Sequence, residues 1–412
     1  MLTGHSKMQC GLLGEHLSHS FSPQIHALLS DYTYRLIELP DEASVGAFLE
    51  KGDFDALNVT IPYKQTVIPY MAELSETALK NGAVNTSTKR PDGQLVGDNT
   101  DYYGFESMVR KSGIRMEGRK VLILGSGGAS KTARVVCKDL GASDVVIISR
   151  KGPDDYDHID RHQDAGIIVN CTPVGMFPGN GSSPVDLSAF PELLGVFDMI
   201  YNPSRTALLL QAEKLGIPHA NGLSMLVYQA VAACERFLHA TIDPALAETI
   251  HSRIAFEMSN IVLVGMPGSG KTTIGQKLSE VTGRKLVDTD EWIVQKVGKA
   301  IPDIFKEAGE EHFRMLEHEA AEEAGKQSGI IISTGGGIVT RQENYDALHQ
   351  NGTIFWIERP LDDLPVEGRP LSNIQTLGSM YQKRAPMYRA FSDRVIWNTA
   401  SVGKAVEAIL EE

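Results

Sequence analysis

Short apolar runs alternate along this chain with longer segments in which apolar residues recur at helical spacing. The runs lie at residues 9–14, 57–60, 121–125, 145–149, 167–170, 196–201, 261–265, 330–334 and 353–357. Parallel strands that are buried on both faces read as continuous apolar runs, and helices join them. The rhythm therefore predicts an α/β fold with mostly parallel sheets. A further helical stretch is expected over residues 244–256.

The length of the chain predicts more than one domain. A chain of 412 residues is too long for one ordinary hydrophobic core, so two or three domains are expected. Glycine-rich turns follow the strands predicted at 121–124 and 261–264, which indicates two nucleotide-binding devices of different form. We expect a boundary near residues 256–260. No Gly/Ser-rich or Pro-rich linker lies there, so the joined parts should be packed or stiffly connected.

Composition and charge narrow the classes of function. With 42% hydrophobic and 22% charged residues, long disordered stretches are not expected. A formal net charge of −13 and the lack of a basic stripe argue against a nucleic-acid partner. The four cysteines are Cys10, Cys137, Cys171 and Cys234, and they form no C-x-x-C pair. With no signal peptide or membrane-spanning run, we expect a cytoplasmic protein without a membrane partner, and its oligomeric state stays open.

The first glycine-rich turn has the form of a dinucleotide-binding turn. It contains Gly125, Ser126, Gly127, Gly128 and Ala129, and a small residue, Ser130, stands where a third glycine often lies. Glycines there leave room for a pyrophosphate at the start of a helix. After the next strand come Ser149 and Arg150, where an NAD site would place an acidic residue. An arginine suits the 2′-phosphate of NADP(H). The alternatives are an ordinary glycine turn and a solvated arginine at a strand end.

Polar side chains upstream of this turn recur at strand ends. They are Ser20, Ser22, Asn58, Thr60, Lys64, Asn85 and Asp101. Hydroxyls and amides suit a small polyhydroxylated acid, and a lysine can polarise a carbonyl that accepts hydride. Together with the segments 170–176, 198–203 and 221–229, these motifs resemble the shikimate dehydrogenase family, over roughly residues 9–256.

This resemblance implies roles for individual residues. Lys64 and Asp101 would be the catalytic pair for reduction of 3-dehydroshikimate. Ser20 and Ser22 would bind the substrate carboxylate, and the hydroxyls or carbonyl of the substrate would be bound by Asn58, Thr60, Asn85 and Gln229. Gly222 and Met225 would lie beside the nicotinamide. Thr172 and Met176 would form part of the wall of the cofactor site. Between residues 150 and 170 the chain is shorter than is usual in the family, so a cofactor-side helix is expected to be missing or replaced by a loop. His158 and His162 have the spacing of a metal pair, but their Asp-rich setting favours a surface loop.

The second glycine-rich turn matches the P-loop pattern G-x-x-x-x-G-K-[ST] between a strand and a helix. Its phosphate-binding residues would be Gly268, Ser269, Gly270, Lys271, Thr272 and Thr273. Backbone N–H groups would face the phosphates of ATP, Lys271 would reach the transferred phosphoryl group, and the Thr272 hydroxyl would bind Mg²⁺.

The residues that follow the P-loop include Asp288 and Asp290 at a strand end, Arg314 and Glu317 in the next helical stretch, and three glycines at 335–337. In this order they resemble those of shikimate kinase. By this resemblance, Asp288 supports Mg²⁺ and Asp290 orients or deprotonates the acceptor hydroxyl. Arg314 and Arg384 would hold the shikimate carboxylate, with Glu317 fixing Arg314. Gly335, Gly336 and Gly337 would line the acceptor pocket, and Arg369 would come from a lid. The alternative for Arg314 is a surface salt bridge with Glu317 or Glu310. The segment 358–371 is shorter than the family's lid and the helix before it.

The sequence therefore predicts a bifunctional enzyme of the shikimate pathway. The expected parts are a substrate-binding domain at 8–101, completed by helices within 222–256, a Rossmann-like NADP domain at 102–221, and a P-loop kinase domain at 259–412. Two alternatives stay open. The first half could be a quinate/shikimate dehydrogenase that prefers NAD, or one half could be a non-catalytic binding or regulatory module.

Overall fold

The computed structural model describes residues 7–17, 20–364 and 374–411. The chain folds into two compact units. The N-terminal unit comprises Met1–Gly175, Ser182–Tyr201 and Gln211–Ala255, and the C-terminal unit comprises Met176–Gly181, Asn202–Leu210 and Phe256–Glu412.

The first sheet of the N-terminal unit is mixed. Its strands are β1 (Gln9–Gly14), β2 (Thr33–Glu38), β3 (Ala56–Val59), β4 (Glu73–Leu74), β5 (Thr86–Lys89) and β6 (Leu95–Asp98), in the order β2-β1-β3-β5-β6-β4. Strand β5 is antiparallel to both of its neighbours, and the other pairs are parallel. The connections include α1 (Ser22–Leu29), α2 (Glu42–Lys51), α3 (Glu76–Asn81) and the 3-10 turn η1 (Ile68–Tyr70).

The second sheet of this unit is parallel throughout. Its strands are β7 (Lys120–Leu124), β8 (Asp144–Ile148), β9 (Ile167–Asn170), β10 (Gly195–Asp198) and β11 (His219–Ala220), in the order β11-β10-β9-β7-β8. The accompanying helices are α4 (Asp101–Ser112), α5 (Gly128–Asp139), α6 (Ala207–Lys214), α7 (Leu223–Leu238) and α8 (Pro244–Met258), with a 3-10 turn, η3 (Leu187–Ala189). Between β8 and β9 stands a short 3-10 helix, η2 (Tyr156–His162), so the expected loss of a regular helix there is confirmed.

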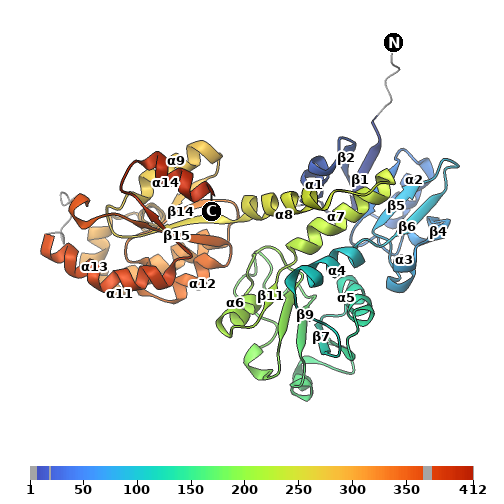
Figure 1. The fold of residues 1–412 in the computed structure, drawn as a ribbon, viewed down its shortest axis with the longest axis horizontal. Helices are drawn as coiled ribbons and strands as arrows, with labels where there is room; N and C mark the ends of the chain where they lie inside the picture. The colour runs from blue at the N-terminus through green and yellow to red at the C-terminus, as the bar shows by residue number, and fades with distance from the viewer. Residues whose placement is uncertain (1–6, 18–19, 365–373, 412) are drawn as a thin grey trace, which may run out of the picture. The chain divides into compact units, whose positions relative to one another are not determined.

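Helices α4 and α7 pack side by side in the N-terminal unit (Figure 1). They lie close together at Gly104, where an added Cβ would lie 2.6 Å from the Met225 carbonyl oxygen. A glycine is needed here because the backbone of the neighbouring helix occupies the side-chain position. This packing places the start of α4, with Asp101, next to the start of α7.

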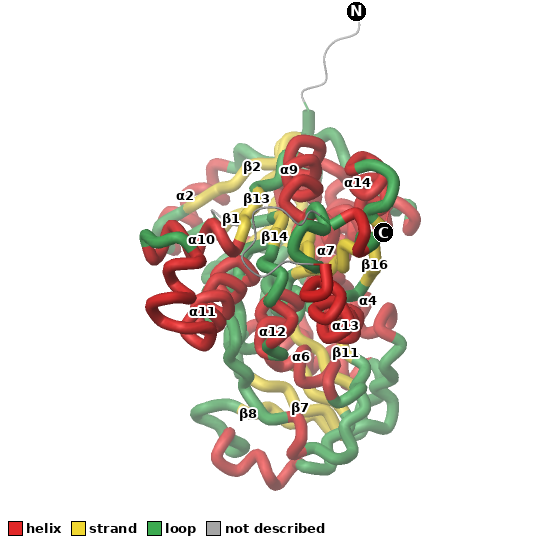
Figure 2. Tube along the Cα trace, turned by 90° about the vertical axis from the view of Figure 1, so that its left-hand side faces the viewer, coloured by secondary structure: helices red, strands yellow, loops and turns green. Residues whose placement is uncertain are grey.

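The C-terminal unit is a parallel sheet with helices on both faces. Its strands are β12 (Asn260–Val264), β13 (Leu286–Asp288), β14 (Ile331–Ser333), β15 (Gly352–Glu358) and β16 (Arg394–Trp397), in the order β13-β14-β12-β15-β16. Its helices are α9 (Lys271–Thr282), α10 (Thr289–Val297), α11 (Ile301–Gly325), α12 (Glu343–His349), α13 (Ile374–Phe391) and α14 (Val402–Glu411), with 3-10 turns η4 (Ile338–Thr340) and η5 (Leu361–Asp363). Helices α9 and α14 cover one face, and α11, α12 and α13 cover the other (Figures 1 and 2).

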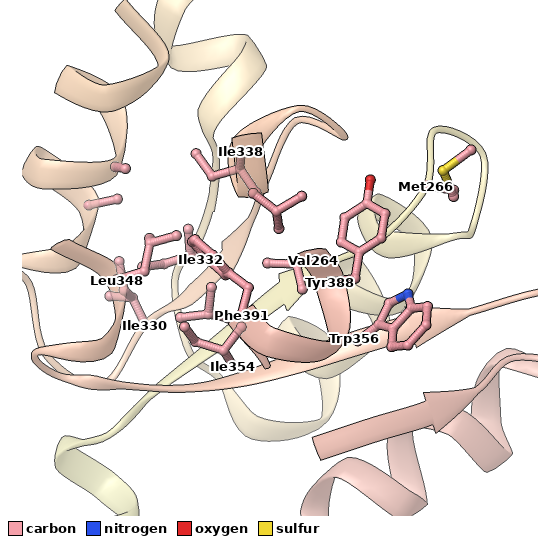
Figure 3. Close-up of a cluster of buried hydrophobic side chains, with 14 of the residues drawn as sticks. Val264, Met266, Ile330, Ile332, Ile338, Leu348, Ile354, Trp356, Tyr388 and Phe391 are labelled. Atoms are coloured by element: carbon pink, nitrogen blue, oxygen red, sulfur yellow. The ribbon is translucent and has the colours of Figure 1, made fainter. Parts of the chain in front are cut away.

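The core on the α11–α13 side of this sheet is closely packed (Figure 3). Trp356 and Tyr388 stack with their ring centroids 5.8 Å apart, and both rings are buried. Branched side chains from β12, β14, β15 and η4 surround them, and residues of α11, α12 and α13 close the cluster. Burial of such side chains is the main contribution to the stability of the unit.

The α/β class and the predominance of parallel strands are confirmed. Strands occur at all nine predicted positions, and β1 and β9 have the predicted bounds. The strands that the apolar runs did not predict include β2, which is mostly exposed, and β5, which consists of the polar residues Thr86–Lys89. Of the helices in the described part of the chain, none combines the length and the apolar character that a bilayer-spanning helix requires.

A substitution at Gly325 tests the packing of α11 on α12. A Cβ at this position would lie 1.8 Å from the Ala347 carbonyl oxygen, so Gly325→Ala should destabilise this contact by about 1–3 kcal/mol. We expect faster hydrogen exchange in peptides that cover α11 and α12. Gly378→Ala is the matched control, because its Cβ meets nothing within 4 Å. Equal exchange in the two variants would contradict the packing.

Candidate active sites

Lys64 and Asp101 form an ion pair in the N-terminal unit. Lys64 Nζ lies 2.6 Å from Asp101 Oδ2, and the side chains are 25% and 16% exposed. Asp101 is the first residue of α4, where the helix dipole favours a negative charge. The second oxygen, Oδ1, accepts a hydrogen bond of 2.9 Å from Asn85 Nδ2. The carboxylate is thus held on both sides, and the ammonium keeps donors for a ligand.

A cavity of about 560 Å³ opens beside this pair. The predicted site residues among those lining it are Ser20, Ser22, Asn58, Thr60, Lys64, Asn85, Asp101, Ala129, Gly222, Met225 and Gln229. They come from separate strand ends, from the starts of α1, α4 and α5, and from α7 and the residue before it. Residues far apart in the sequence are therefore brought to one hollow, although their individual roles stay predictions.

The cavity also contains residues that the sequence did not single out for a role. They are Leu12, His16, Leu17, Val59, Ile61, Met199, Tyr201 and Leu226. Tyr201 stands in the segment that carried the family resemblance, and its ring packs edge-on against Phe21 with centroids 6.0 Å apart. Burial raises the pKa of Tyr201, so its hydroxyl keeps its proton. The signal in the sequence that could have identified Tyr201 as a cavity residue is its position shortly after strand β10.

The first glycine turn has the geometry that a pyrophosphate needs. Gly125 adopts φ 102°, and a Cβ there would lie 3.0 Å from the Thr172 side chain. Next to Gly127 and Gly128, which begin α5, a Cβ would meet nothing within 4 Å. Ser130, in place of the third glycine, is buried and donates to the Gly127 carbonyl oxygen at 2.6 Å. The open space at the helix start fits the phosphates of a dinucleotide.

Arg150 lies at the end of β8 and is exposed, as a contact to a 2′-phosphate requires. Ser149 is buried, and its backbone N–H donates to the Asp154 carbonyl oxygen at 3.1 Å. In η2, His158 pairs with Asp155 at 2.7 Å and His162 with Asp154 at 3.1 Å. The two histidines thus have separate partners in a surface segment, in agreement with the surface-loop interpretation.

Gly222 precedes α7, and close packing against the neighbouring backbone leaves no room for a side chain at this position. A Cβ at this position would lie 2.0 Å from the Met199 carbonyl oxygen. Met225 follows one turn later and lines the cavity. Thr172 and Met176 were predicted to form part of the cofactor wall. In the described part of the chain, Thr172 packs against Gly125. Met176 is 47% exposed and belongs to the C-terminal unit. Neither of these two lines the cavity.

The second glycine turn has the backbone of a phosphate-binding loop. Gly265, Gly268 and Gly270 adopt φ of 151°, 85° and 99°, which L side chains rarely adopt. Lys271 begins α9, is buried, and donates to the Gly265 and Met266 carbonyl oxygens at 2.9 and 3.0 Å. The Ser269 hydroxyl is also buried and has no hydrogen-bond partner among the described residues. These groups fit a bound nucleotide phosphate.

Thr272 and Asp288 together fit a magnesium ion. Thr272 Oγ1 lies 3.2 Å from Asp288 Oδ2, while Asp288 Oδ1 accepts from the backbone N–H of Asp290 at the start of α10. Mg²⁺ takes hard oxygen ligands and keeps several waters and substrate phosphates, so two protein oxygens suffice. Thr273, the next residue of α9, is exposed.

Asp290 is partly buried next to the acceptor loop, the predicted acceptor-lining segment at residues 335–337. Burial, reinforced by the charge of Asp288, raises the pKa of Asp290. Its Oδ1 has no hydrogen-bond partner among the described residues. A Cβ on Gly335 would lie 2.6 Å from this oxygen and 3.0 Å from Glu317 Oε1. Gly335 therefore leaves the space in which the carboxylate can meet a hydroxyl group.

Arg314 and Arg384 converge on the same glycine loop. Arg314 donates to Glu317 at 2.7 Å and to Glu310 at 3.0 Å, but it is only 9% exposed, so it is not a surface salt bridge. A Cβ on Gly337 would lie 1.9 Å from Arg314 Nη1. Arg384 Nη1 donates to the Gly336 carbonyl oxygen at 3.1 Å.

Two residues that hold the glycine loop were missed by the sequence interpretation. The Tyr388 hydroxyl donates to the Gly336 carbonyl oxygen at 2.5 Å, and the Thr289 hydroxyl accepts from the Gly335 N–H at 3.1 Å. Tyr388 lies one helical turn after Arg384, which is the signal that could have identified it. The predicted lid residue Arg369 lies outside the described residues.

Comparisons with known proteins agree with this geometry. A model of the shikimate dehydrogenase substrate binding domain matches residues 12–87, and a model of shikimate kinase matches residues 267–412. The NADP⁺ shikimate dehydrogenase of Caldicellulosiruptor bescii is 38% identical over 253 residues, which cover 54% of this chain and 86% of that protein. This chain belongs to the shikimate dehydrogenase family. Its C-terminal part carries a shikimate kinase domain, so it is a bifunctional enzyme of the shikimate pathway.

Solved structures support the dehydrogenase assignment. A chorismate mutase/shikimate 5-dehydrogenase fusion protein from Clostridium acetobutylicum is 36% identical with a TM-score of 0.57, covering 60% of this chain and 97% of that one. The shikimate 5-dehydrogenase of Thermus thermophilus, in complex with NADP(H) and shikimate, is 28% identical with a TM-score of 0.54, covering 60% and 99%.

Gly335→Ala tests the geometry of the acceptor loop. The added methyl group would push against Asp290 and Glu317, and displacement of a reacting group by about 1 Å can cost roughly 100-fold in rate. We expect phosphorylation of shikimate by the full-length variant to fall by about that factor. Dehydrogenase activity in the same sample is the control and should be unchanged. Phosphorylation within twofold of the wild type would show that Asp290 does not need this space.

Proposed function

We propose that the N-terminal unit reduces 3-dehydroshikimate to shikimate with NADPH, and that the C-terminal unit phosphorylates the shikimate 3-hydroxyl with ATP. The product of the first reaction is the substrate of the second. The observation that carries the proposal is the Lys64–Asp101 ion pair at the wall of a cavity lined by the predicted carboxylate-binding and hydroxyl-binding residues.

In the reduction, bound NADPH supplies the hydride that the substrate carbonyl carbon accepts. The Lys64 ammonium donates a proton to the carbonyl oxygen as negative charge develops there. Asp101 holds this ammonium in place, and Asn85 fixes the second carboxylate oxygen. Ser20 and Ser22 are the proposed donors to the substrate carboxylate. Asn58, Thr60 and Gln229 orient the hydroxyl groups.

In the phosphorylation, Asp290 accepts the proton of the attacking hydroxyl group. Its Oδ1 atom, which is buried close to Gly335 and has no partner among the described residues, is left for that hydroxyl. Arg314 and Arg384 bind the shikimate carboxylate, and Lys271 neutralises charge on the transferred phosphoryl group. Thr272 and Asp288 would hold Mg²⁺, which would offset the negative charge of the nucleotide phosphates. The lid role of Arg369 stays a prediction from the family resemblance.

One competing assignment for the first half is oxidation of quinate or shikimate with NAD. It is prompted by the likeness to quinate dehydrogenase from Corynebacterium glutamicum in complex with NAD, which is 26% identical with a TM-score of 0.55. The exposed Arg150 at the end of β8 favours NADP(H), because its charge complements a 2′-phosphate. The higher identity to NADP⁺ shikimate dehydrogenases supports the same choice.

Two single substitutions in the full-length chain test both sites. Lys64→Ala should lower kcat for reduction of 3-dehydroshikimate by about 100-fold or more, because it removes the proton donor. Lys271→Ala should lower kcat for phosphorylation by about 100- to 1,000-fold. Each variant should keep the other reaction, which is the internal control. If a unit keeps its reaction after its lysine is replaced, that unit does not use the proposed mechanism. If the wild-type protein does not catalyse one of the two reactions, the corresponding unit is a non-catalytic module.

Arg150→Ala tests the cofactor assignment. Loss of a charge-assisted hydrogen bond to the 2′-phosphate should raise KM for NADPH by roughly tenfold or more, with little change for NADH. Steady-state kinetics with both cofactors give the comparison. Arg115→Ala is a control, because Arg115 is exposed and precedes β7, whereas the glycine turn follows it. Equal effects of Arg150→Ala on the two cofactors would contradict the assignment and favour NAD.

A further inference from the structure

Tyr34 makes a hydrogen bond to a residue of the dehydrogenase cavity although it does not line the cavity itself. Its hydroxyl donates to Asn58 Oδ1 at 2.8 Å. Tyr34 lies on β2 and Asn58 on β3, and β1 runs between these two strands. Two strands separated by a third are about 10 Å apart. The bond therefore spans the width of β1 and needs a side chain as long as tyrosine.

The strand register explains how the two side chains meet. Tyr34 pairs with Cys10 of β1, and Asn58 pairs with Leu12 of the same strand. Positions two residues apart along a strand share one face of the sheet, so Tyr34 and Asn58 project to the same side. Tyr34 crosses β1 diagonally on that face and reaches the end of β3, where the cavity begins.

The Asn58 amide has a fixed orientation in this arrangement. Its Nδ2 donates to Thr86 Oγ1 at 3.1 Å and to the Asn85 carbonyl oxygen at 3.4 Å, while its Oδ1 accepts from Tyr34. The short bond to the oxygen comes from Tyr34, and the bonds from the nitrogen are longer. An amide whose oxygen loses its donor can rotate more easily. The Asn85 carbonyl oxygen can only accept, so it decides that Nδ2 faces Asn85, and the Tyr34 hydroxyl supplies the shorter bond that holds Oδ1 in this orientation.

The ring of Tyr34 is supported independently of this bond. It stacks on His26, with centroids 4.0 Å apart and planes 11° apart, and His26 Nδ1 lies 2.5 Å from the Tyr32 hydroxyl. Burial raises the pKa of Tyr34, and a hydrogen bond from Ser22 opposes the shift only in part, so the hydroxyl keeps its proton. It therefore remains a donor across the physiological pH range.

The catalytic pair is held by other contacts. Asn85 Oδ1 accepts from Thr86 Oγ1, the acceptor of Asn58 Nδ2, at 3.0 Å, but also from the backbone N–H of Thr100 at the shorter distance of 2.6 Å, which by itself directs Asn85 Nδ2 to Asp101. A backbone N–H can only donate, so this orientation of Asn85 has its own anchor. Loss of the Tyr34 hydroxyl should therefore disturb Asn58 and leave Lys64 and Asp101 in place.

We infer that Tyr34 is a positioning residue that orients the Asn58 amide for binding of the substrate in the dehydrogenase cavity. The inference rests on the proposed function, in which Asn58 binds a substrate hydroxyl or carbonyl group. It assigns to Tyr34 an effect on substrate affinity that is separate from the chemical step. Other polar groups at the cavity reach the substrate directly, whereas Tyr34 acts through Asn58 from the far side of a strand.

Tyr34→Phe in the full-length chain tests this role. Removal of the hydroxyl should raise KM for 3-dehydroshikimate by roughly fivefold, the effect of one hydrogen bond, while kcat and KM for NADPH change by less than twofold. Tyr32→Phe is the matched control. It removes a hydroxyl from the same aromatic cluster but no bond to Asn58, so all three constants should stay within twofold of the wild type. Kinase activity of the same samples checks that the chain is intact.

A double-mutant cycle shows whether Tyr34 acts through Asn58. In an Asn58→Ala background, Tyr34→Phe should change KM for 3-dehydroshikimate by less than twofold, because the group that it orients is gone, whereas an effect transmitted through Ser22 would persist in that background and overturn the inference. Fully additive effects would overturn the inference, and so would an equal rise of KM in Tyr32→Phe, since packing of the cluster would then be the cause. An unchanged KM in Tyr34→Phe alone would also overturn it. Absence of 3-dehydroshikimate reduction by the wild type would instead overturn the proposed function.

Discussion

Both units depend on a sharp glycine turn at the carboxyl end of a buried parallel strand. Gly125 follows β7 with φ 102°, and Gly265 follows β12 with φ 151°. A Cβ on Gly265 would lie 2.5 Å from the Ile357 carbonyl oxygen, so another residue would separate β12 from β15. The turn aims the N–H groups of the next helix at the space above the sheet, which is where an anionic ligand can bind. The remaining polar groups of each site are arranged around that space.

The two units hold their carboxylates in different ways. Asp101 is partly exposed and has an ammonium partner on one oxygen and an amide on the other. Asp290 is also partly exposed, but one of its oxygens is buried without a partner among the described residues, and its pKa is raised by burial and by Asp288. These environments match their proposed roles, since Asp101 positions a proton donor and Asp290 accepts a proton. The difference comes from the surrounding side chains, because the residue type is the same.

Polar residues that line the dehydrogenase cavity are held in place by hydrogen bonds to residues behind them. Asn58 and Asn85 were predicted as substrate-binding residues, but each also makes hydrogen bonds on the side away from the cavity, to Tyr34 and Thr100 respectively. An amide has several donors and acceptors, and those that do not meet the ligand must be satisfied elsewhere. In the kinase domain Tyr388 has a similar relation to Gly336, since it holds a carbonyl oxygen of the acceptor loop from within the hydrophobic core.

The sequence by itself determined the α/β class, the nine apolar strands and both glycine turns. These features depend on local patterns, namely runs of buried residues and residues that permit unusual φ values. Strands such as β2 could not be predicted, because half-exposed strands lack a continuous apolar run and are specified by pairing with β1. Only the tertiary structure decided that Tyr34 meets Asn58, that Arg314 is buried against Gly337, and that Asp290 has an oxygen without a described partner beside Gly335. Such contacts join residues from different elements, so their distances follow from strand order and helix packing.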